Sequence, residues 1–421
     1  MSDTRTFVIV GAGQAGRWLA LTLRADGFAG RIVWFGDEPH RPYERPPLSK
    51  AVLKGDVPLA QLALVQDAAF AELTADFRPG ERVVAIDRER RVVRTEGGTQ
   101  VEYDALFLAN GGRARSLPGL APHPRVHTLR TYEDALALKV QLGQVGQEPG
   151  QGGPSRRIIV IGGGWIGLEV AASSRVMGCE VAVVEAAPRL CIRTVPPCVS
   201  EHLAALHRAH GVDLRIGDGV QSVEPSDSGV KVRLASGATI EGDVLVIGIG
   251  LIANDQLAAE AGIAVAGGVL TDAHGRTDDP HIYAVGDVAN PMRSHGARLR
   301  IESWENAQRQ AVAAAKAALG LAHDPDAEGP PWFWSDQYDD NLQLLGLPGE
   351  AMQIVERHVP DKRQHVFFFC DGPRVRAVAA VNAGRELKIV RKWMREGRYP
   401  DRARLNDTSV DLNKLPLAAT T

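Results

Sequence analysis

The sequence lacks the features that mark membrane-spanning, metal-bound and nucleic-acid-binding proteins. Its 421 residues include four cysteines, at positions 179, 191, 198 and 370, and no two of them have the spacing of a C-x-x-C or metal-ligand motif. No apolar run approaches the ~18 residues that a membrane helix needs. The formal net charge of −3 excludes an overall basic balance. We therefore expect no bound metal, no membrane span and no nucleic-acid partner.

The sequence also lacks a signal or transit peptide pattern and is poor in aromatic residues. The first residues pass directly into an apolar run at 6–10 without the pattern of a signal or transit peptide, which predicts a cytoplasmic location. Aromatic residues make up only 5% of the chain, yet Trp332, Phe333, Trp334 and Tyr338 stand close together. This concentration predicts a local role, and core packing is the simplest one.

Glycine, by contrast, is abundant, and one glycine cluster has a specific setting. An apolar β-branched run at 157–161 precedes the cluster at 162–167, and a helical pattern without Pro or Gly follows at 168–177. A second strand pattern, 180–184, then ends at Glu185. Strand, glycine turn, helix, strand and acid together form the dinucleotide-binding fingerprint.

Each glycine of this cluster has an expected task. Gly162 allows the tight turn, Gly164 lets the backbone approach a pyrophosphate, and Gly167 lets the helix pack closely on the strand. Ile166 lies in the same turn, where the free N–H groups at the start of the helix face the phosphates. We therefore predict that this turn binds a dinucleotide.

A second copy of the pattern stands at the N-terminus. The run 6–10 leads into a turn that contains Gly11, Gly13, Ala15 and Gly16, and a helix over 17–26 and a strand over 31–35 follow. Two such units predict two dinucleotides held against each other. The alternative is a pair of ordinary βαβ units without a ligand.

The acids that follow the two units are candidate ribose ligands. In the first unit we expect Asp37 to bind a ribose, with the neighbouring Glu38 as the alternative. In the second unit we expect Glu185 to bind the adenosine ribose and to repel a 2′-phosphate, which favours NADH over NADPH. Arg189 and Arg193 leave that preference open, because an arginine can accept a phosphate.

Other charged residues stand where a cofactor would lie. Prolines surround Arg45 in a stiff loop, 39–50, that also carries Lys50. Glu169 lies on the first turn of the second helix, where an acid is also favourable with the helix dipole. Asp287 ends a hydrophobic strand, at the sheet edge where α/β proteins bind ligands. Ser303 is the expected N-cap of a helix over 304–319.

The last segment ends in a basic stretch. Residues 385–404 contain eight Arg or Lys against three acids. A solvated helix face is one interpretation, and a docking surface for an acidic protein is the other.

Several of these motifs resemble the glutathione-reductase-like ferredoxin reductases, the group that includes putidaredoxin reductase, rubredoxin reductase and the reductase components of aromatic-ring dioxygenases. The resemblance covers nearly the whole chain. Its most specific parts are Pro42-Tyr43-Glu44-Arg45-Pro46-Pro47-Leu48-Ser49-Lys50, residues 162–169, Ala284-Val285-Gly286-Asp287, residues 301–307 and Trp334-Ser335-Asp336-Gln337. Two departures are Asn110, where the group usually has Thr, and the bulky Trp304.

The resemblance implies an α/β fold with two Rossmann-like dinucleotide-binding domains and a C-terminal α+β domain. It implies FAD binding by residues 1–118 and 249–328, NADH binding by residues 119–248, and a C-terminal interface domain at 329–421. The FAD contacts that it implies are Ala15, Asp37, Arg45, Lys50, Val83, Arg130, Asp287 and Trp304.

For NADH the resemblance, together with the fingerprint, indicates residues around the second turn. They are Gly162, Gly164, Ile166, Gly167, Glu185, Arg193 and Gly250. Lys50 and Glu169 would form an ion pair near the flavin N5, and Trp334 would lie close to the nicotinamide and flavin rings.

The function that the resemblance implies is an NADH:ferredoxin reductase, which passes electrons through FAD, one at a time, to a [2Fe-2S] ferredoxin that serves a bacterial dioxygenase or P450. One alternative is an NADH oxidase or NADH:disulfide reductase, but no cysteine stands in the region 42–50, where disulfide reductases have a redox pair. The other alternative is an NADH-sensing flavoprotein. Monomer and homodimer both stay open.

Overall fold

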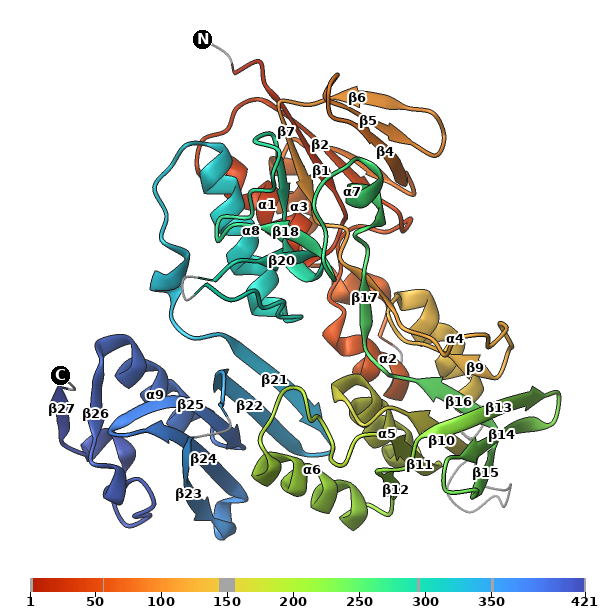
Figure 1. The fold of residues 1–421 in the computed structure, drawn as a ribbon, viewed down its shortest axis with the longest axis vertical. Coiled ribbons are helices and arrows are strands. Elements are labelled where there is room, and N and C mark those ends of the chain that lie inside the picture. Colours follow the sequence, from red (N-terminus) through yellow and green to blue (C-terminus); the bar gives the residue numbers. More distant parts are fainter. Residues whose placement is uncertain (1–2, 56, 144–155, 294–295, 350–351, 420–421) are drawn as a thin grey trace. The chain divides into compact units, whose positions relative to one another are not determined.

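The computed structural model describes residues 3–55, 57–143, 156–293, 296–349 and 352–419 (Figure 1). The chain forms two compact units. Unit 1 comprises residues 1–44, 58–113 and 251–328, and unit 2 comprises residues 45–57, 114–250 and 329–421. The segment with Arg45 and Lys50 therefore belongs to unit 2, together with the second glycine turn.

Unit 1 is built on a parallel sheet. Its strands are β1 (Thr6–Val10), β2 (Arg31–Gly36), β3 (Asp76–Pro79), β7 (Ala105–Leu108) and β19 (Ile282–Ala284). Their order is β19-β7-β1-β2-β3, and every pair is parallel. The central strand β1 is buried on both faces, which explains its continuous apolar run.

The two faces of this sheet are covered by different structures. Phe7 and Ile9 point to one face and pack with α1 (Gln14–Ala25) and α8 (Trp304–Ala318), which lie side by side in Figure 1. Val8 and Val10 point to the other face, against an antiparallel layer of β4 (Val83–Asp87), β5 (Val92–Thr95) and β6 (Gln100–Glu102). The side chains alternate because a strand has a period of two.

Unit 2 repeats this plan around the second glycine turn. The parallel strands are β9 (Val126–His127), β10 (Arg157–Ile161), β11 (Glu180–Glu185), β12 (Asp213–Ile216) and β16 (Val244–Ile247), in the order β12-β11-β10-β16-β9. An antiparallel layer of β13 (Val220–Ser226), β14 (Gly229–Leu234) and β15 (Thr239–Gly242) covers one face. The helices α5 (Trp165–Val176), α4 (Tyr132–Gly143) and α6 (Pro197–Ala209) complete this part.

A second sheet of unit 2 is antiparallel. Its strands are β21 (Trp332–Gln337), β22 (Asp340–Gly346), β23 (Gln353–Val359), β24 (Gln364–Asp371) and β25 (Arg374–Val381), in the order β21-β22-β25-β24-β23. The helix α9 (Gly384–Glu396) packs on it through Leu387, Val390 and Trp393. The expected α/β fold class, with two Rossmann-like parts and a C-terminal α+β part, is thereby confirmed.

The remaining elements are short. In unit 1 they are η2 (Leu59–Leu62), α3 (Asp67–Glu72), β17 (Leu251–Ala253), α7 (Gln256–Glu260), β18 (Val269–Thr271), η3 (Gly286–Val288), β20 (Ala289–Pro291) and η4 (Pro325–Glu328), and β8 (Gly112–Ala114) lies where the chain leaves it. In unit 2 they are η1 (Pro46–Ser49), α2 (Ala51–Lys54), η5 (Pro360–Lys362), β26 (Arg398–Pro400), η6 (Arg402–Arg404), η7 (Leu412–Lys414) and β27 (Leu417–Ala419).

Both fingerprint helices begin three residues earlier than the sequence pattern predicts. α1 begins at Gln14 instead of residue 17, and α5 begins at Trp165 instead of residue 168. In each case the second glycine of the turn, Gly13 or Gly164, is the N-cap. The helix therefore starts inside the turn, because the third glycine is itself helical. Within the described residues no helix has the length and apolar character of a membrane span.

Candidate functional site: two glycine turns and a buried ion pair

The first glycine turn needs glycine at two positions. Gly11 has φ +116°, and a Cβ there would lie 2.3 Å from the carbonyl oxygen of Ala109. A Cβ on Gly16 would lie 2.1 Å from the carbonyl oxygen of Gly11. No side chain fits in either place, so α1 starts directly against the strands β1 and β7.

The start of α1 is open above Gly13. A Cβ on Gly13 would meet no atom within 4 Å, and no side chain caps the N-terminus of α1. Both polar atoms of the Gln14 side chain are buried without a partner among the described residues. Uncapped N–H groups and unpaired buried polar atoms are what a bound dinucleotide would satisfy.

Several predicted cofactor residues meet at this helix start. Ala15 is buried next to Gly286, where a Cβ would lie 3.1 Å from the Ala15 Cβ, and Asp287 follows in η3. Ser303 caps α8, as expected, because its hydroxyl accepts from the Asn306 N–H at 3.2 Å. Trp304 is therefore the first residue of α8.

The acids after β2 differ in their surroundings. The Tyr43 hydroxyl donates to Glu38, whereas Asp37 is exposed. This difference favours Asp37 as the ribose ligand. Val83, another predicted contact, is the first residue of β4 and is buried.

The second glycine turn has the same geometry. Gly162 has φ +107°, with 2.4 Å between its hypothetical Cβ and the Gly248 carbonyl oxygen, and a Cβ on Gly167 would lie 2.1 Å from the Gly162 oxygen. Glu185 ends β11 and folds back onto the turn. Its carboxylate accepts from the Gly163 and Ala187 N–H groups, each at 2.7 Å.

The two arginines near Glu185 have different tasks. Arg189 donates to the backbone of the loop that follows it and to Ser200 Oγ at 2.9 Å, so it holds that loop. Arg193 is exposed, and its guanidinium stands 3.1 Å from the position of a Cβ on Gly250, which has φ +107°. Ile166 is 44% exposed on the first turn of α5. Arg193, Gly250 and Ile166 are thus accessible, and Arg189 is engaged.

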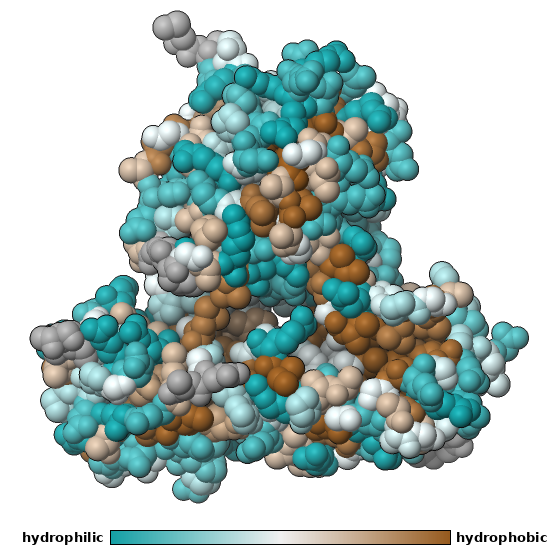
Figure 2. Space-filling view, viewed as in Figure 1, coloured by the Kyte–Doolittle hydropathy of each residue, from teal (hydrophilic) through white to brown (hydrophobic). Residues whose placement is uncertain are grey.

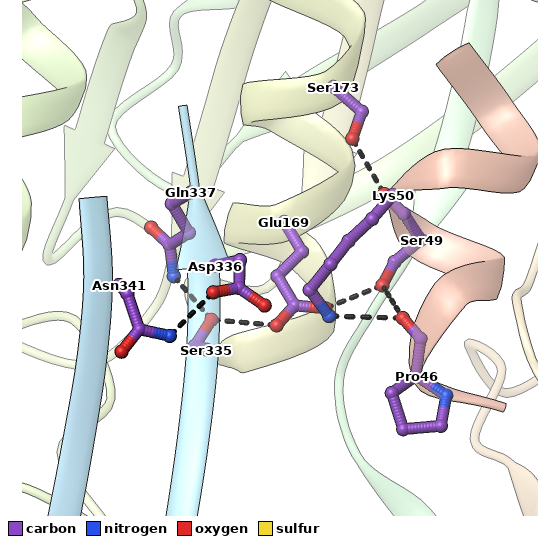
Figure 3. A network of polar contacts seen from close by, with 9 residues as sticks. All are labelled: Pro46, Ser49, Lys50, Glu169, Ser173, Ser335, Asp336, Gln337 and Asn341. Carbon is purple, nitrogen blue, oxygen red and sulfur yellow. Dashed lines mark hydrogen bonds and ion pairs between the residues drawn. The ribbon is translucent and has the colours of Figure 1, made fainter. Parts of the chain in front are cut away.

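A buried ion pair lies on α5, one turn after Gly164. Lys50 Nζ is 2.6 Å from Glu169 Oε2, and the Glu169 side chain is only 4% exposed (Figure 3). The same oxygen accepts from Ser49 Oγ at 2.5 Å, and Oε1 accepts from Ser335 Oγ at 2.7 Å. Lys50 also donates to the Pro46 carbonyl oxygen. The carboxylate is thus held by three side chains from two other segments.

The strand β21 alternates between two environments. Phe333 contacts Trp165 with ring centroids 4.8 Å apart, and Ser335 and Gln337 follow on the same face. Trp334 lies on the other face, where it stacks on Trp332 at 4.9 Å. The structure therefore joins Lys50 to Glu169 but leaves Trp334 on the opposite face of β21.

Arg45 and Arg130, two predicted FAD contacts, also come together within unit 2. Arg45 donates to the Arg130 carbonyl oxygen at 2.6 Å. Asp134, at the start of α4, accepts from the Arg130 and Thr131 N–H groups. The stiff loop is thereby joined to the segment before α4.

Sequence reasoning gave no role to four polar residues of this region. Ser49, Ser335 and Gln337 stand within the motifs that carry the resemblance, whereas His207 does not, and all four are buried. Burial lowers the pKa of His207 to about 4, against the hydrogen bond to Gln337, which acts in the opposite direction. One signal was available for His207, since it continues the buried α6 positions 199 and 203 at a spacing of four.

Asn110 has an unexpected partner in unit 1. Its side-chain amide donates to the Asn254 carbonyl oxygen, and Asn254 donates back to the Asn110 oxygen, both at 2.8 Å. This reciprocal pair joins the segments after β7 and after β17. Asn254 carried no signal in the sequence.

The basic stretch 385–404 is partly neutralised. Arg385 pairs with Asp411 at 2.6 Å, and Lys392 lies 3.9 Å from Glu396. Lys388 and Arg395 are exposed on α9. Figure 2 shows mainly hydrophilic side chains over the α9 region of the face that it presents. Among the described residues, no three His, Cys, Asp or Glu side chains form a group that could hold a metal ion.

Comparison with known families gives two matches that together span most of the chain. Residues 5–311 match the pyridine nucleotide-disulphide oxidoreductase family, and residues 332–416 match the reductase C-terminal family.

Solved structures are similar over nearly the full length. The putidaredoxin reductase of a covalent putidaredoxin reductase–putidaredoxin complex is 36% identical, covers 98% of each chain and has a TM-score of 0.89. The ferredoxin reductase for the CYP199A2 system from Rhodopseudomonas palustris is 35% identical, covers 98% of this chain and 99% of its own, and has a TM-score of 0.90. The water-forming NADH oxidase from Lactobacillus brevis, at 20% identity, 97% and 95% coverage and a TM-score of 0.82, shares the fold.

Proposed function

The chain belongs to the pyridine nucleotide-disulphide oxidoreductase family, and we propose that it is an NADH:ferredoxin reductase. Membership of this family makes it an oxidoreductase and implies that it binds FAD and NAD(P)H. Its electron acceptor would be a [2Fe-2S] ferredoxin that serves a bacterial oxygenase, either a Rieske dioxygenase or a P450. The two relatives at 35–36% identity, which include a reductase crystallised with putidaredoxin, are the observation that carries this proposal.

The cysteines support a reductase without thiol chemistry. All four lie in unit 2, and none falls in the loop 42–50. Cys179, Cys191 and Cys370 are buried, and burial raises the pKa of each thiol. A protonated buried thiol is a poor nucleophile. A disulfide reductase is therefore disfavoured.

The first glycine turn is the proposed FAD site. The N–H groups of α1 would hold the pyrophosphate, with Gly11, Gly13, Ala15 and Gly16 providing the close backbone approach. Asp37 would bind the ribose. The other proposed contacts are Val83, Asp287 and Trp304 in unit 1 and Arg45, Lys50 and Arg130 in unit 2. When bound, FAD supplies the conversion of a two-electron hydride transfer into single-electron transfers.

The second glycine turn is the proposed NADH site. Gly162, Gly164 and Gly167 bring the N-terminus of α5 close to the pyrophosphate, and Ile166 borders it. Glu185 would bind the adenosine ribose. Arg193 and Gly250 would contact the outer side of the nucleotide.

Lys50 and Glu169 are proposed to set the electrostatics of the reaction. Glu169 is surrounded by donors, so it acts as an acceptor that holds the Lys50 ammonium in place. Lys50 then contributes a fixed positive charge rather than an obligate proton. We further propose that Trp334, which lies on the face of β21 opposite to Ser335, stands close to the nicotinamide and flavin rings. We also propose which segments bind each nucleotide. Residues 1–118 and 249–328 would bind FAD, residues 119–248 would bind NADH, and residues 329–421 would form an interface domain.

The exposed cations of 385–404 are the proposed docking surface for the ferredoxin. Lys388 and Arg395 are exposed on α9, and the rest of the stretch adds Arg398 and Arg404 on the surface. An acidic partner would be attracted to this charge, and salt would weaken the attraction.

The test is cytochrome c reduction by NADH, with and without a [2Fe-2S] ferredoxin, at low and moderate salt. We expect a rate that depends strongly on the ferredoxin and that falls as salt increases. A ferredoxin-independent rate with rapid oxygen consumption would instead establish an NADH oxidase. A change of molecular size on adding NADH, with negligible electron transfer, would establish a sensing flavoprotein.

A further inference from the structure

A line of buried polar side chains runs from α6 to the Lys50–Glu169 pair, entirely within unit 2. His207 Nε2 lies 2.8 Å from Gln337 Oε1, and Gln337 Nε2 lies 3.0 Å from Ser335 Oγ. Ser335 Oγ lies 2.7 Å from Glu169 Oε1. Figure 3 shows the last two of these contacts beside Lys50. The line therefore joins a helix outside the glycine turn to the ion pair.

The hydrogen bonds of this line have one direction. An ionised carboxylate only accepts, so the Ser335 hydroxyl must donate its single hydrogen to Glu169. Its lone pair is then free to accept from the Gln337 amide. The Gln337 oxygen can only accept, so His207 carries its hydrogen on Nε2, and its Nδ1 faces the Tyr338 hydroxyl at 3.2 Å.

Because these side chains are buried, no solvent is available to replace a lost hydrogen bond, and each donor must keep its direction. The exposed fractions are 0% for His207 and Ser335, 3% for Gln337 and 4% for Glu169. A buried polar group that loses its partner is costly in such surroundings, so a reversal at one member disturbs the next. Burial also lowers the pKa of His207 to about 4, which keeps the imidazole neutral at pH 7.

We propose that His207, Gln337 and Ser335 are positioning residues that orient the Glu169 carboxylate toward Lys50. Ser335 holds one carboxylate oxygen and leaves the other for Lys50 and Ser49. His207 fixes the orientation of the Gln337 amide, and this orientation fixes the hydroxyl of Ser335. The effect of this line on catalysis rests on the proposed function of the Lys50–Glu169 pair.

The first test measures the arrangement without activity. The 15N resonances of labelled histidines report which ring nitrogen carries hydrogen, and the His207→Gln variant identifies the His207 signals. We expect a neutral ring with hydrogen on Nε2 at pH 7. Gln337→Glu places a carboxylate beside the ring and should raise the pKa of His207 by at least ~1 unit. A cationic ring or an Nδ1–H tautomer in the unmodified protein would overturn the proposal.

The second test measures flavin reduction by NADH in the holoenzyme by stopped flow. Gln337→Glu turns the Ser335 hydroxyl away from Glu169, and we expect the rate to fall roughly tenfold. Gln353→Glu adds the same charge at an exposed position of the same sheet and should leave the rate unchanged. FAD content and the thermal midpoint show whether each variant is folded.

A double-mutant cycle separates positioning from simple packing. Ser335→Ala should slow reduction in the unmodified protein but have no further effect in a Glu169→Gln background, because the two residues act through one interaction. Independent, multiplicative effects would overturn the proposal. The proposal would also be overturned if Ser335→Ala reduced its flavin at the normal rate while Lys50→Ala reduced it slowly. If Lys50→Ala is also unchanged, the proposed role of the ion pair is wrong, and the tautomer of His207 decides the proposal alone.

Discussion

The two glycine turns share one backbone geometry but differ in what covers them. Gly11 and Gly162 have nearly the same positive φ, and the hypothetical Cβ of Gly16 or Gly167 is 2.1 Å from the first glycine of its own turn. At the fifth position of the motif, however, Ala15 is 6% exposed and Ile166 is 44% exposed. In unit 1 the segment with Gly286 lies over the start of the helix.

The two units also differ in the acid that follows the second strand and in the residue two positions after the third glycine. Asp37 is exposed, whereas Glu185 is tied to its own turn by two N–H groups. Two residues after the third glycine, unit 1 has Trp18 and unit 2 has Glu169, which holds Lys50. We infer that a covered turn suits a cofactor that stays bound, and that an open turn beside a charged pair suits a substrate that enters and leaves.

The largest effect should come from removing Lys50. Lys50→Ala leaves Glu169 charged and buried, which should cost ~3–5 kcal/mol of unfolding free energy and slow flavin reduction by at least ~10-fold. Lys50 is one of several proposed FAD contacts and the first glycine turn is unchanged, so most of the FAD should stay bound. Stopped-flow reduction and denaturation curves measure both.

The matched variant is Lys50→Ala combined with Glu169→Gln. It removes the unpaired charge, so it should recover much of the lost stability but not the rate. A Lys50→Ala protein that lost all of its FAD would contradict the proposal that the first glycine turn provides most of the FAD binding.

Lowering the pH should reduce the free energy of unfolding of unit 2, because His207 is buried in its neutral form. Its folded pKa of about 4 lies below its ordinary 6.5, so between these values the unfolded chain binds a proton that the folded protein does not. Stability should therefore fall as pH drops from 6.5 toward 4, by up to ~3 kcal/mol from this residue, and level off below.

Denaturation midpoints across this pH range test the prediction. The His207→Gln variant should lose less stability between pH 6.5 and 4 than the unmodified protein. Parallel curves for the two proteins would show that His207 does not contribute. His207 lies on α6 in unit 2, so its substitution should not change the first glycine turn, which lies in unit 1.

The sequence predicted the two turns because their geometry is encoded locally. The spacing of three glycines between a strand and a helix requires the positive φ and the close packing that the structure shows. The Ser303 cap was predictable for the same reason, since a cap and its N–H group lie three residues apart.

The surroundings of Glu169 were not predictable in this way. Ser49 and Ser335 lie 120 and 166 residues from Glu169 along the chain, and their contacts depend on how three segments pack. A serine next to a lysine, or in an aromatic strand, has many ordinary roles. Only the motif resemblance pointed to Lys50 and Glu169 as a pair, and it did not include His207.

A smaller effect should follow from adding one methyl group to each turn. Gly16→Ala and Gly167→Ala force a Cβ against a backbone oxygen, an overlap that costs ~1–3 kcal/mol and weakens nucleotide binding roughly 10–100-fold. Gly16→Ala should reduce the FAD content. Gly167→Ala should keep FAD and raise the KM for NADH.

Gly97→Ala and Gly219→Ala serve as controls, because a Cβ at either position would lie 3.7 Å or more from its nearest neighbour. FAD absorbance per protein and NADH saturation curves measure the four variants. Equal loss of FAD in Gly16→Ala and Gly167→Ala would refute the separate roles of the turns.

The smallest expected effect concerns the coenzyme preference. Glu185→Ala removes the negative charge from the proposed ribose position and should raise the ratio of kcat/KM for NADPH over NADH roughly tenfold, about 1.4 kcal/mol. Arg193 is exposed next to Gly250 and would then attract the 2′-phosphate. Adding Arg193→Ala should cancel the gain, whereas Asp37→Ala in the first turn should not change the ratio. An unchanged preference in Glu185→Ala would show that the arginines, and not the acid, set the coenzyme preference.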